Sequence, residues 1–123
     1  MSVLEFFKQK AAAYVSPMGV REMSGHLQLL DVRIGPVPER IPDSIAIPLN
    51  ELSSRMKEID SEVLVVVYCW DTWCSLATKA AIELLEAGFA AKELYGGVAA
   101  WQAMSFELEK VTDENASGPR CDC

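Results

Sequence analysis

Residues 62–75 read EVLVVVYCWDTWCS, and this stretch predicts both the fold class and the reactive site of the chain. Its centre, Val63–Val67, is an apolar run without polar alternation. Such a run is typical of a parallel strand whose two faces are both covered by helices. Cys69 follows this strand, and a helical pattern runs from Ser75 to Ala87, where Gly88 ends it. The stretch therefore predicts a strand, a cysteine-containing loop and a helix in succession.

The position of Cys69 makes it a candidate nucleophile. Parallel sheets bind ligands at the carboxyl ends of their strands, where loops lead into helix N-termini. Exposed backbone N–H groups and the positive end of the helix dipole stabilise a thiolate there, which lowers the pKa of a cysteine. The alternative is an inert cysteine packed at the end of the strand, and position alone leaves both interpretations open.

The flanking sequence alternates helices with strands. We predict helices over Val3–Tyr14, from Ser16-Pro17 to Gly25, from an Asn50 cap to Ile59, and over Val98–Met104. We predict further strands over Leu27–Val32, Ser44–Ile47 and Ala91–Tyr95. This alternation implies a parallel α/β sheet with right-handed crossovers.

Size and charge narrow the classes of function. The chain has 123 residues, half of them hydrophobic, which suits one globular domain. Its net charge of −7 argues against nucleic acids and anionic membranes as partners. The run Val63–Val67 is too short to cross a bilayer, and Glu5 and Lys8 interrupt the apolar start of the chain. We therefore expect a cytoplasmic protein whose thiols are mostly reduced.

We expect three segments: an N-terminal helix in residues 1–15 packed on the domain, the domain itself in residues 16–108, and a flexible acidic tail in residues 109–123. The tail contains Cys121 and Cys123. Either these cysteines are incidental, or they relay sulfur or redox equivalents, or they join the loop cysteines in a metal site. Their Cys-x-Cys spacing differs from the Cys-x2-Cys knuckles of structural zinc sites, so we expect no metal and no other cofactor.

The order of several short blocks resembles the rhodanese (sulfurtransferase) domain family, from about Ser16 to Phe106. The blocks that carry the resemblance are Leu30–Arg33, Arg40–Leu49, Val66–Cys69, Ala80-Ala81, Leu84-Leu85, Gly88-Phe89 and Leu94–Trp101. The resemblance implies a five-stranded parallel sheet flanked by helices on both faces. It also implies that Cys69 takes a sulfane sulfur from thiosulfate or a persulfide and passes it to a thiol or a cyanide-like acceptor.

The loop after Cys69 resembles a rhodanese subgroup with the pattern Cys-Trp-x-x-x-Cys. We expect the backbone N–H groups of this loop to cradle the sulfur or the anionic donor; its residues are Trp70, Asp71, Thr72, Trp73, Cys74 and Ser75. Ser75 stands where phosphatases of this fold have an arginine, which disfavours phosphate esters. The single charge, Asp71, predicts weak thiosulfate activity and a preference for a less charged persulfide. Arg40 is a candidate for positive charge near the pocket.

Cys74 has two interpretations, because it either resolves Cys69 as a disulfide or packs as a small apolar residue. Structural roles are expected for a charge network of Asp31 and Arg33, for the turn residues Gly96 and Gly97, and for Trp101 in the core. A sulfurtransferase is the preferred function. The alternatives are a thiol–disulfide redox protein that uses Cys69 and Cys74, and a non-catalytic rhodanese module. A protein sulfur acceptor or a thiol reductant is then an expected partner.

Overall fold

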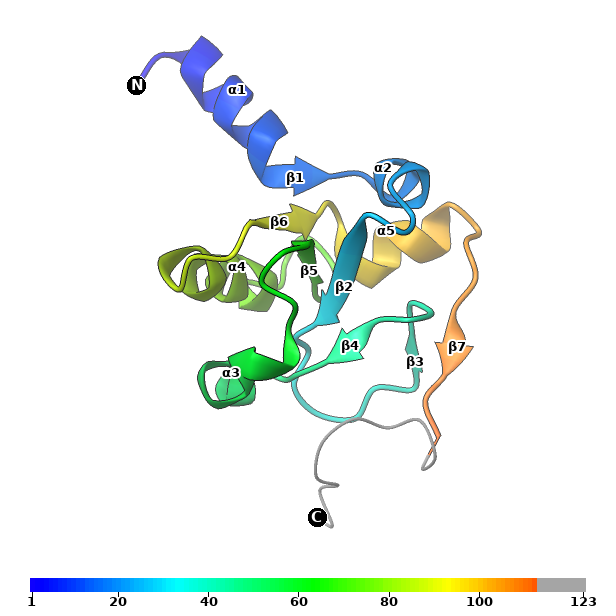
Figure 1. Cartoon of the computed structure of the whole chain (residues 1–123). Coiled ribbons are helices and arrows are strands. Elements are labelled where there is room, and N and C mark those ends of the chain that lie inside the picture. The colour runs from blue at the N-terminus through cyan, green and yellow to red at the C-terminus, as the bar shows by residue number, and fades with distance from the viewer. Residues whose placement is uncertain (113–123) are drawn as a thin grey trace.

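A five-stranded parallel sheet forms the centre of the molecule (Figure 1). The computed structural model describes residues 1–112. The strands lie in the order β1 (Tyr14–Val15), β6 (Ala91–Leu94), β5 (Leu64–Tyr68), β2 (Leu27–Asp31) and β4 (Ile45–Ala46), and all pairs are parallel. This sheet confirms the predicted α/β fold class. β1, at one edge, was not predicted as a strand.

Helices cover both faces of the sheet, and the side chains of β5 alternate between them. Val65 and Val67 pack in the cluster with α3 (Leu49–Arg55) and α4 (Leu76–Glu86). Val66 and Tyr68 pack in the other cluster, which α2 (Pro17–Glu22) and α5 (Gly97–Ala103) complete. All four side chains are fully buried. Each buried valine contributes about 1.5–3 kcal/mol, which explains why an unbroken apolar run forms this strand.

Local signals fix most of the helix ends. The Ser16 hydroxyl accepts a hydrogen bond from Gly19 N at 3.0 Å and caps α2, as the Ser-Pro pair predicted. The expected Asn50 cap of α3 is wrong, because the helix begins directly after Pro48, whose fixed backbone geometry suits that position. A short 3₁₀ turn, Met56–Glu58, then leads to the buried Ile59.

A second, two-stranded antiparallel sheet joins the segment before β4 to the end of the described chain. β3 (Glu39–Arg40) pairs with β7 (Glu109–Lys110), and Arg40 Nε donates to Glu109 Oε1 at 2.7 Å. The boundary predicted for a flexible tail at residue 109 is therefore wrong, because this pairing orders residues 109 and 110. Cys121 and Cys123 lie outside the described residues.

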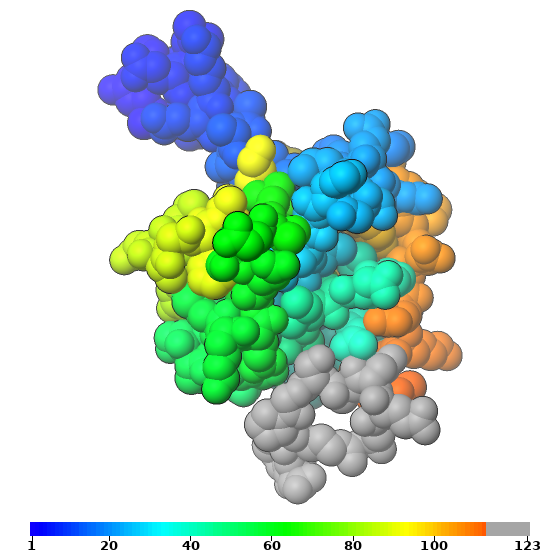
Figure 2. Space-filling view, in the orientation of Figure 1, coloured from blue at the N-terminus to red at the C-terminus, as the bar shows by residue number. Residues whose placement is uncertain are grey.

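The N-terminal helix α1 (Val3–Ala13) does not pack along the domain as expected. None of its residues is buried, and it stands out from the body of the molecule (Figure 2). The chain becomes extended at Tyr14, where β1 pairs with β6, and this turn in direction carries the helix away from the sheet. No helix in residues 1–112 is both long enough and apolar enough to cross a bilayer.

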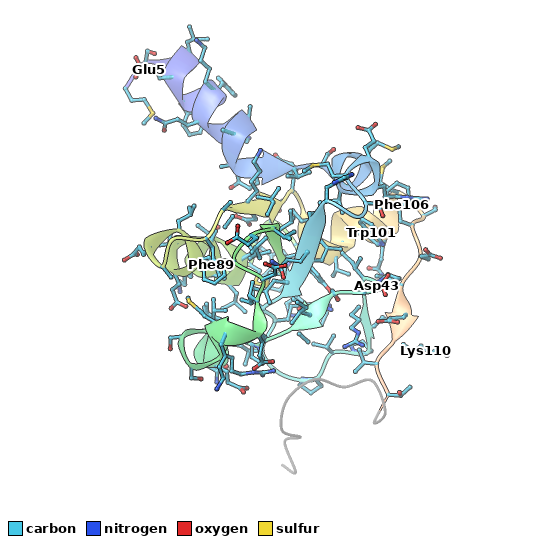
Figure 3. The ribbon with its side chains drawn as sticks, in the orientation of Figure 1. Glu5, Asp43, Phe89, Trp101, Phe106 and Lys110 are labelled. Carbon is cyan, nitrogen blue, oxygen red and sulfur yellow. A yellow bond between two sulfur atoms is a disulfide. The ribbon has the colours of Figure 1, made fainter. Side chains whose placement is uncertain are left out.

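Trp101 has the core role that its sequence context suggested. It is buried in α5, and its ring meets that of Phe106 edge to face, with the centroids 5.0 Å apart (Figure 3). Its Nε1–H donates to the Glu107 carbonyl at 2.7 Å. These contacts tie the end of α5 to the segment that leads to β7.

Candidate active site

Cys69 lies at the carboxyl end of β5, where the chain leaves the sheet, and only 2% of its surface is exposed. The first turn of α5 holds the backbone of this residue and its neighbour. Val98 N donates to the Cys69 carbonyl at 2.9 Å, and Ala99 N donates to the Trp70 carbonyl at 3.0 Å. The start of the loop after β5 is therefore fixed by a helix far from it in sequence.

The Gly96-Gly97 turn makes this close approach possible. Gly97 has φ +61°, and a Cβ on it would lie 2.6 Å from the Cys69 carbonyl oxygen and 3.0 Å from Asp71 N. Gly96 has φ +79°, and its Cβ would lie 2.6 Å from that of Ala100. A side chain at position 97 would therefore displace the loop. The turn role predicted for both glycines is present in the structure, and Gly97 adds direct contact with the loop.

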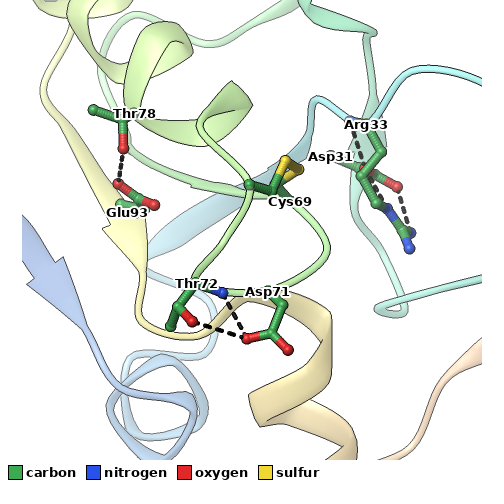
Figure 4. Close-up of a disulfide and its surroundings, with 8 residues drawn as sticks. Asp31, Arg33, Cys69, Asp71, Thr72, Thr78 and Glu93 are labelled. Atoms are coloured by element: carbon green, nitrogen blue, oxygen red, sulfur yellow. Dashed lines mark hydrogen bonds and ion pairs between the residues drawn. A yellow bond between two sulfur atoms is a disulfide. The ribbon is translucent and has the colours of Figure 1, made fainter.

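A disulfide joins Cys69 to Cys74, with the two Cα atoms 6.4 Å apart (Figure 4). Cys74 is half-buried and also packs against the cluster between the sheet and α3 and α4. Its two predicted roles, apolar packing and bonding to Cys69, therefore occur together. In this state neither sulfur is a nucleophile, so the loop reacts as a thiolate only after reduction.

Asp71 organises the interior of the loop. Its Oδ1 accepts hydrogen bonds from Thr72 N at 2.6 Å and Thr72 Oγ1 at 3.2 Å, and its carbonyl accepts one from Cys74 N at 3.1 Å (Figure 4). The N–H groups of Thr72 and Cys74 are thus already bonded within the loop. The expectation that every loop N–H group cradles a ligand is wrong for these two. Ser75 precedes α4 and makes no side-chain capping bond.

Arg33 supplies the positive charge beside the loop. It forms a buried bidentate ion pair with Asp31, with Nε–Oδ1 2.9 Å and Nη2–Oδ2 2.8 Å, as the predicted structural network required (Figure 4). The guanidinium also donates to the Glu39 carbonyl and lies over the Trp70 ring, 4.4 Å from its centroid. This stacking fixes the tryptophan that follows Cys69.

Arg40 does not have the predicted place near Cys69. Its charge is paired with Glu109 across the small sheet, and it lines a different cavity, together with Asp31, Pro48 and Val111. The pairing of β3 with β7 turns this side chain away from the loop. That pairing joins residues far apart in the chain, so local sequence did not indicate it.

Two small cavities flank the loop. One, of about 240 Å³, is lined by Arg33, Trp70 and Trp73, and the Trp73 side chain is 74% exposed at its rim. The other, of about 180 Å³, contains both disulfide cysteines in its lining. We call the second the Lys10–Glu93 cavity, after the two charged residues that α1 and β6 bring to it.

Glu93 was missed in the sequence, although it is an acidic residue within an interior strand. Its Oε2 accepts a hydrogen bond from Thr78 Oγ1 of α4 at 2.9 Å (Figure 4). Burial raises the pKa of Glu93 above its usual range, and the Thr78 hydrogen bond opposes that rise. The signal was available, because period-two alternation along β6 places Glu93 on the same face as Ala91, which packs in the core.

The buried Asp31–Arg33 pair predicts a large loss of stability on substitution. Arg33→Met removes one partner and leaves a buried carboxylate without its cation, so the free energy of unfolding should fall by about 3–5 kcal/mol. Urea denaturation measures this. The control is Arg55→Met, which breaks pairs with Glu51 and Glu58 whose side chains are 33% and 41% exposed, so it should change stability less. Equal, small effects of both substitutions would contradict a structural role for the buried pair.

The chain is similar in sequence and in structure to known proteins. The sequence model of the rhodanese-like domain family matches residues 18–104. Among curated proteins, the HTH-type transcriptional regulator Rv0324 of Mycobacterium tuberculosis is 31% identical over 94 residues, which are 73% of this chain. The matched region is 41% of that regulator, so the chain spans about two fifths of its length.

Solved structures share the fold. A full-length protein from Lactobacillus plantarum is 30% identical, with a TM-score of 0.80 and coverage of 88% of this chain and 96% of that one. The BH2092 protein of Bacillus halodurans is 27% identical, with a TM-score of 0.76 and coverage of 86% and 82%. A rhodanese-related protein from Thermoplasma volcanium, 21% identical with a TM-score of 0.68, covers 77% of this chain and 95% of its own; it agrees in fold.

Proposed function

The chain belongs to the rhodanese-like domain family, and from this membership we propose that it is a sulfurtransferase in which Cys69 carries a sulfane sulfur as a persulfide. The observation that carries the proposal is the position of Cys69. It directly follows the central strand β5, and its carbonyl is held by the first turn of α5. Once the disulfide is reduced, the hydrogen bonds from α5 hold the backbone of the nucleophile in place before a donor binds.

The chemistry needs two displacement steps. In the first, the Cys69 thiolate attacks the outer sulfur of a donor R–S–SH, a Cys69 S–S bond forms, and the donor leaves as its thiolate. In the second, an acceptor nucleophile attacks the outer sulfur, the S–S bond breaks, and the Cys69 thiolate is restored. The protons pass to the departing thiolate or to solvent, and no external oxidant or reductant is consumed.

The electrostatics of the loop favour a singly charged sulfur group. α4, of 11 residues, begins directly after the loop and points its positive end toward it, and Arg33 stacks on Trp70. The helix N-terminus stabilises a thiolate or a persulfide anion, whereas the charge of Arg33 is already paired with Asp31. Asp71 opposes the helix N-terminus with a carboxylate inside the loop. A donor with one charge is therefore favoured over one with two.

Thiosulfate, a dianion, should be a poor donor for this protein. We expect weak thiosulfate:cyanide activity in the wild-type protein. Asp71→Asn should raise kcat/KM for thiosulfate by about three- to tenfold, because the substitution removes the negative charge of Asp71. The asparagine keeps a side-chain oxygen that can accept the hydrogen bond from Thr72 N. Kinetics of thiocyanate formation measure both values. An organic persulfide with no other charged group is the matched control and should respond less, because it carries at most one negative charge. Robust turnover of wild-type protein at low-millimolar thiosulfate would contradict this account.

The disulfide favours a second candidate function, in which Cys69 and Cys74 act as a redox couple. Attack of the Cys74 thiolate on Cys69 Sγ of the persulfide would form the Cys69–Cys74 bond and release hydrosulfide. Two thiol sulfurs are then oxidised, and the sulfane sulfur is reduced to sulfide. A thiol reductant would restore the dithiol. In this function Cys74→Ser should abolish turnover, whereas in simple sulfur transfer it should not.

The direct test of the sulfurtransferase is catalysed transfer from an organic persulfide to cyanide by the reduced protein, measured as thiocyanate above the uncatalysed rate. Clear catalysis supports the proposal. No transfer with any persulfide donor, together with an ordinary pKa for both loop thiols, would contradict it and favour the non-catalytic module. The match to part of a transcriptional regulator gives that alternative a specific basis.

A further inference from the structure

The Lys10–Glu93 cavity carries both signs of charge beside the reactive cysteines. Its volume of about 180 Å³ is large enough to hold a small organic molecule or several waters. The disulfide of Cys69 and Cys74 lines the cavity, and the ionisable side chains of the lining come from separate parts of the chain: Lys10, Tyr14, Asp71, Glu93 and Tyr95. The cavity is therefore a small polar chamber that contains the disulfide and a mixed set of charges.

Lys10 brings the positive charge. It lies in the last turn of α1, and its Nζ is 5.3 Å from the centroid of the Tyr95 ring. Within residues 1–112 its ammonium forms no ion pair. α1 buries none of its own residues, yet it delivers this ammonium to the rim of the reactive site. The helix thus contributes a cation that is available to an anionic group of a ligand.

Glu93, in strand β6, brings the negative charge. One of its carboxylate oxygens is bonded to Thr78, and within the described residues Glu93 has no cationic partner. Desolvation raises the pKa of Glu93, because burial disfavours the ionised carboxylate. A nearby cation would stabilise that ionised form. A ligand ammonium would supply that cation. Asp71 is the second carboxylate in the lining.

We propose that this cavity binds the small thiol or persulfide substrate as a zwitterion, with its carboxylate on Lys10, its ammonium on Glu93 and its sulfur toward the Cys69–Cys74 pair. The ligand class is therefore an α-amino-acid thiol, whose few non-hydrogen atoms suit the size of the cavity. The inference rests on the proposed function for the identity of the reacting cysteines and adds the recognition of the substrate.

The oxidised protein allows recognition to be measured without sulfur transfer. The ligand thiolate attacks one sulfur of the Cys69–Cys74 bond, that bond breaks, and the other cysteine leaves as a thiolate that takes up a proton. A second ligand thiol then attacks the mixed disulfide, which gives the protein dithiol and the ligand disulfide. Two protein sulfurs are reduced and two ligand thiols are oxidised.

The experiment compares four reductants that differ in charge: cysteine, cysteamine without the carboxylate, 3-mercaptopropionate without the ammonium, and 2-mercaptoethanol with neither. Tryptophan fluorescence follows reduction, because Trp70 adjoins Cys69. Lys10→Gln should lower the second-order rate constant by about three- to tenfold for cysteine and 3-mercaptopropionate alone. Glu93→Gln should lower it by a similar factor for cysteine and cysteamine alone. Each variant is compared with wild type for the same thiol, so differences in thiol pKa cancel.

Lys8→Gln is the matched control, because it removes the same charge from the same helix at an exposed position outside the cavity lining. It should leave all four rates unchanged. If Lys10→Gln and Glu93→Gln alter all four thiols equally, or if Lys8→Gln reproduces the Lys10 effect, the zwitterion site is refuted. Since this assay involves no sulfane sulfur, such a result would leave the sulfurtransferase proposal intact, and failure of sulfur transfer would leave this one intact.

Discussion

Cys69→Ser should lower kcat/KM for sulfur transfer from an organic persulfide by about 10³-fold or more. The serine hydroxyl is a far weaker nucleophile toward sulfur at neutral pH and forms no persulfide, so both displacement steps are lost. The side chain is 2% exposed and differs from serine by one atom, so the fold should persist. Thiocyanate formation gives the rate, and urea denaturation verifies the fold.

Cys74→Ser is the matched variant, because it removes the other half of the disulfide from the same loop. It should keep transfer within about tenfold of the reduced wild type if Cys69 alone carries the sulfur. Equal loss in both variants would replace simple transfer with the dithiol mechanism. Retention of wild-type rates in Cys69→Ser would exclude Cys69 as the sulfur carrier.

Gly97→Ala should lower kcat/KM by about 10²-fold, because the new Cβ would lie 2.6 Å from the Cys69 carbonyl oxygen. The loop must then shift, and the hydrogen bond from Val98 N that fixes Cys69 is strained or lost. Kinetics on a persulfide donor measure the loss. The positive φ at position 97 adds a second cost, because alanine is strained in this backbone conformation and glycine is not.

Gly88→Ala separates these two effects. Gly88 has φ +93°, yet a Cβ there meets nothing within 4 Å, and the residue follows α4 at the end distant from the loop. It should lose stability through backbone strain while it keeps its activity. If Gly97→Ala and Gly88→Ala reduce activity to the same extent, contact between Gly97 and the loop does not position Cys69.

Strong local signals predicted the main elements of the fold. The unbroken run in β5 and the Ser-Pro start of α2 depend on neighbouring residues, and both are present. The two-residue strands β1, β3 and β7 were missed because they have no periodicity. Their pairing partners lie far away in sequence, so only the folded chain brings them together. α1 is exposed because the extended residues of β1 separate it from the rest of the domain.

Local sequence likewise predicted one part of the candidate site and missed another part. Cys69, Asp71 and Cys74 lie within one loop, and the short spacing of the two cysteines made their disulfide one of the two roles predicted for Cys74. Lys10 and Glu93 line one cavity because β1 pairs with β6 at the edge of the sheet, which local sequence does not encode. Similarly, Arg33 and not Arg40 lies beside Trp70, since Glu109 of β7 holds the latter arginine. Amino-acid composition does not indicate which of these two arginines lies beside the loop.

Intact mass of the Cys74→Ser variant tests the central claim most directly, because its persulfide cannot be resolved as the Cys69–Cys74 disulfide. After incubation with an organic persulfide and removal of the donor, the account predicts a gain of about 32 Da, one sulfur atom, on the peptide that contains Cys69. Cyanide should remove this mass and yield thiocyanate. An unchanged mass, or added sulfur found only on the peptide with Cys121 and Cys123, would contradict a Cys69 persulfide.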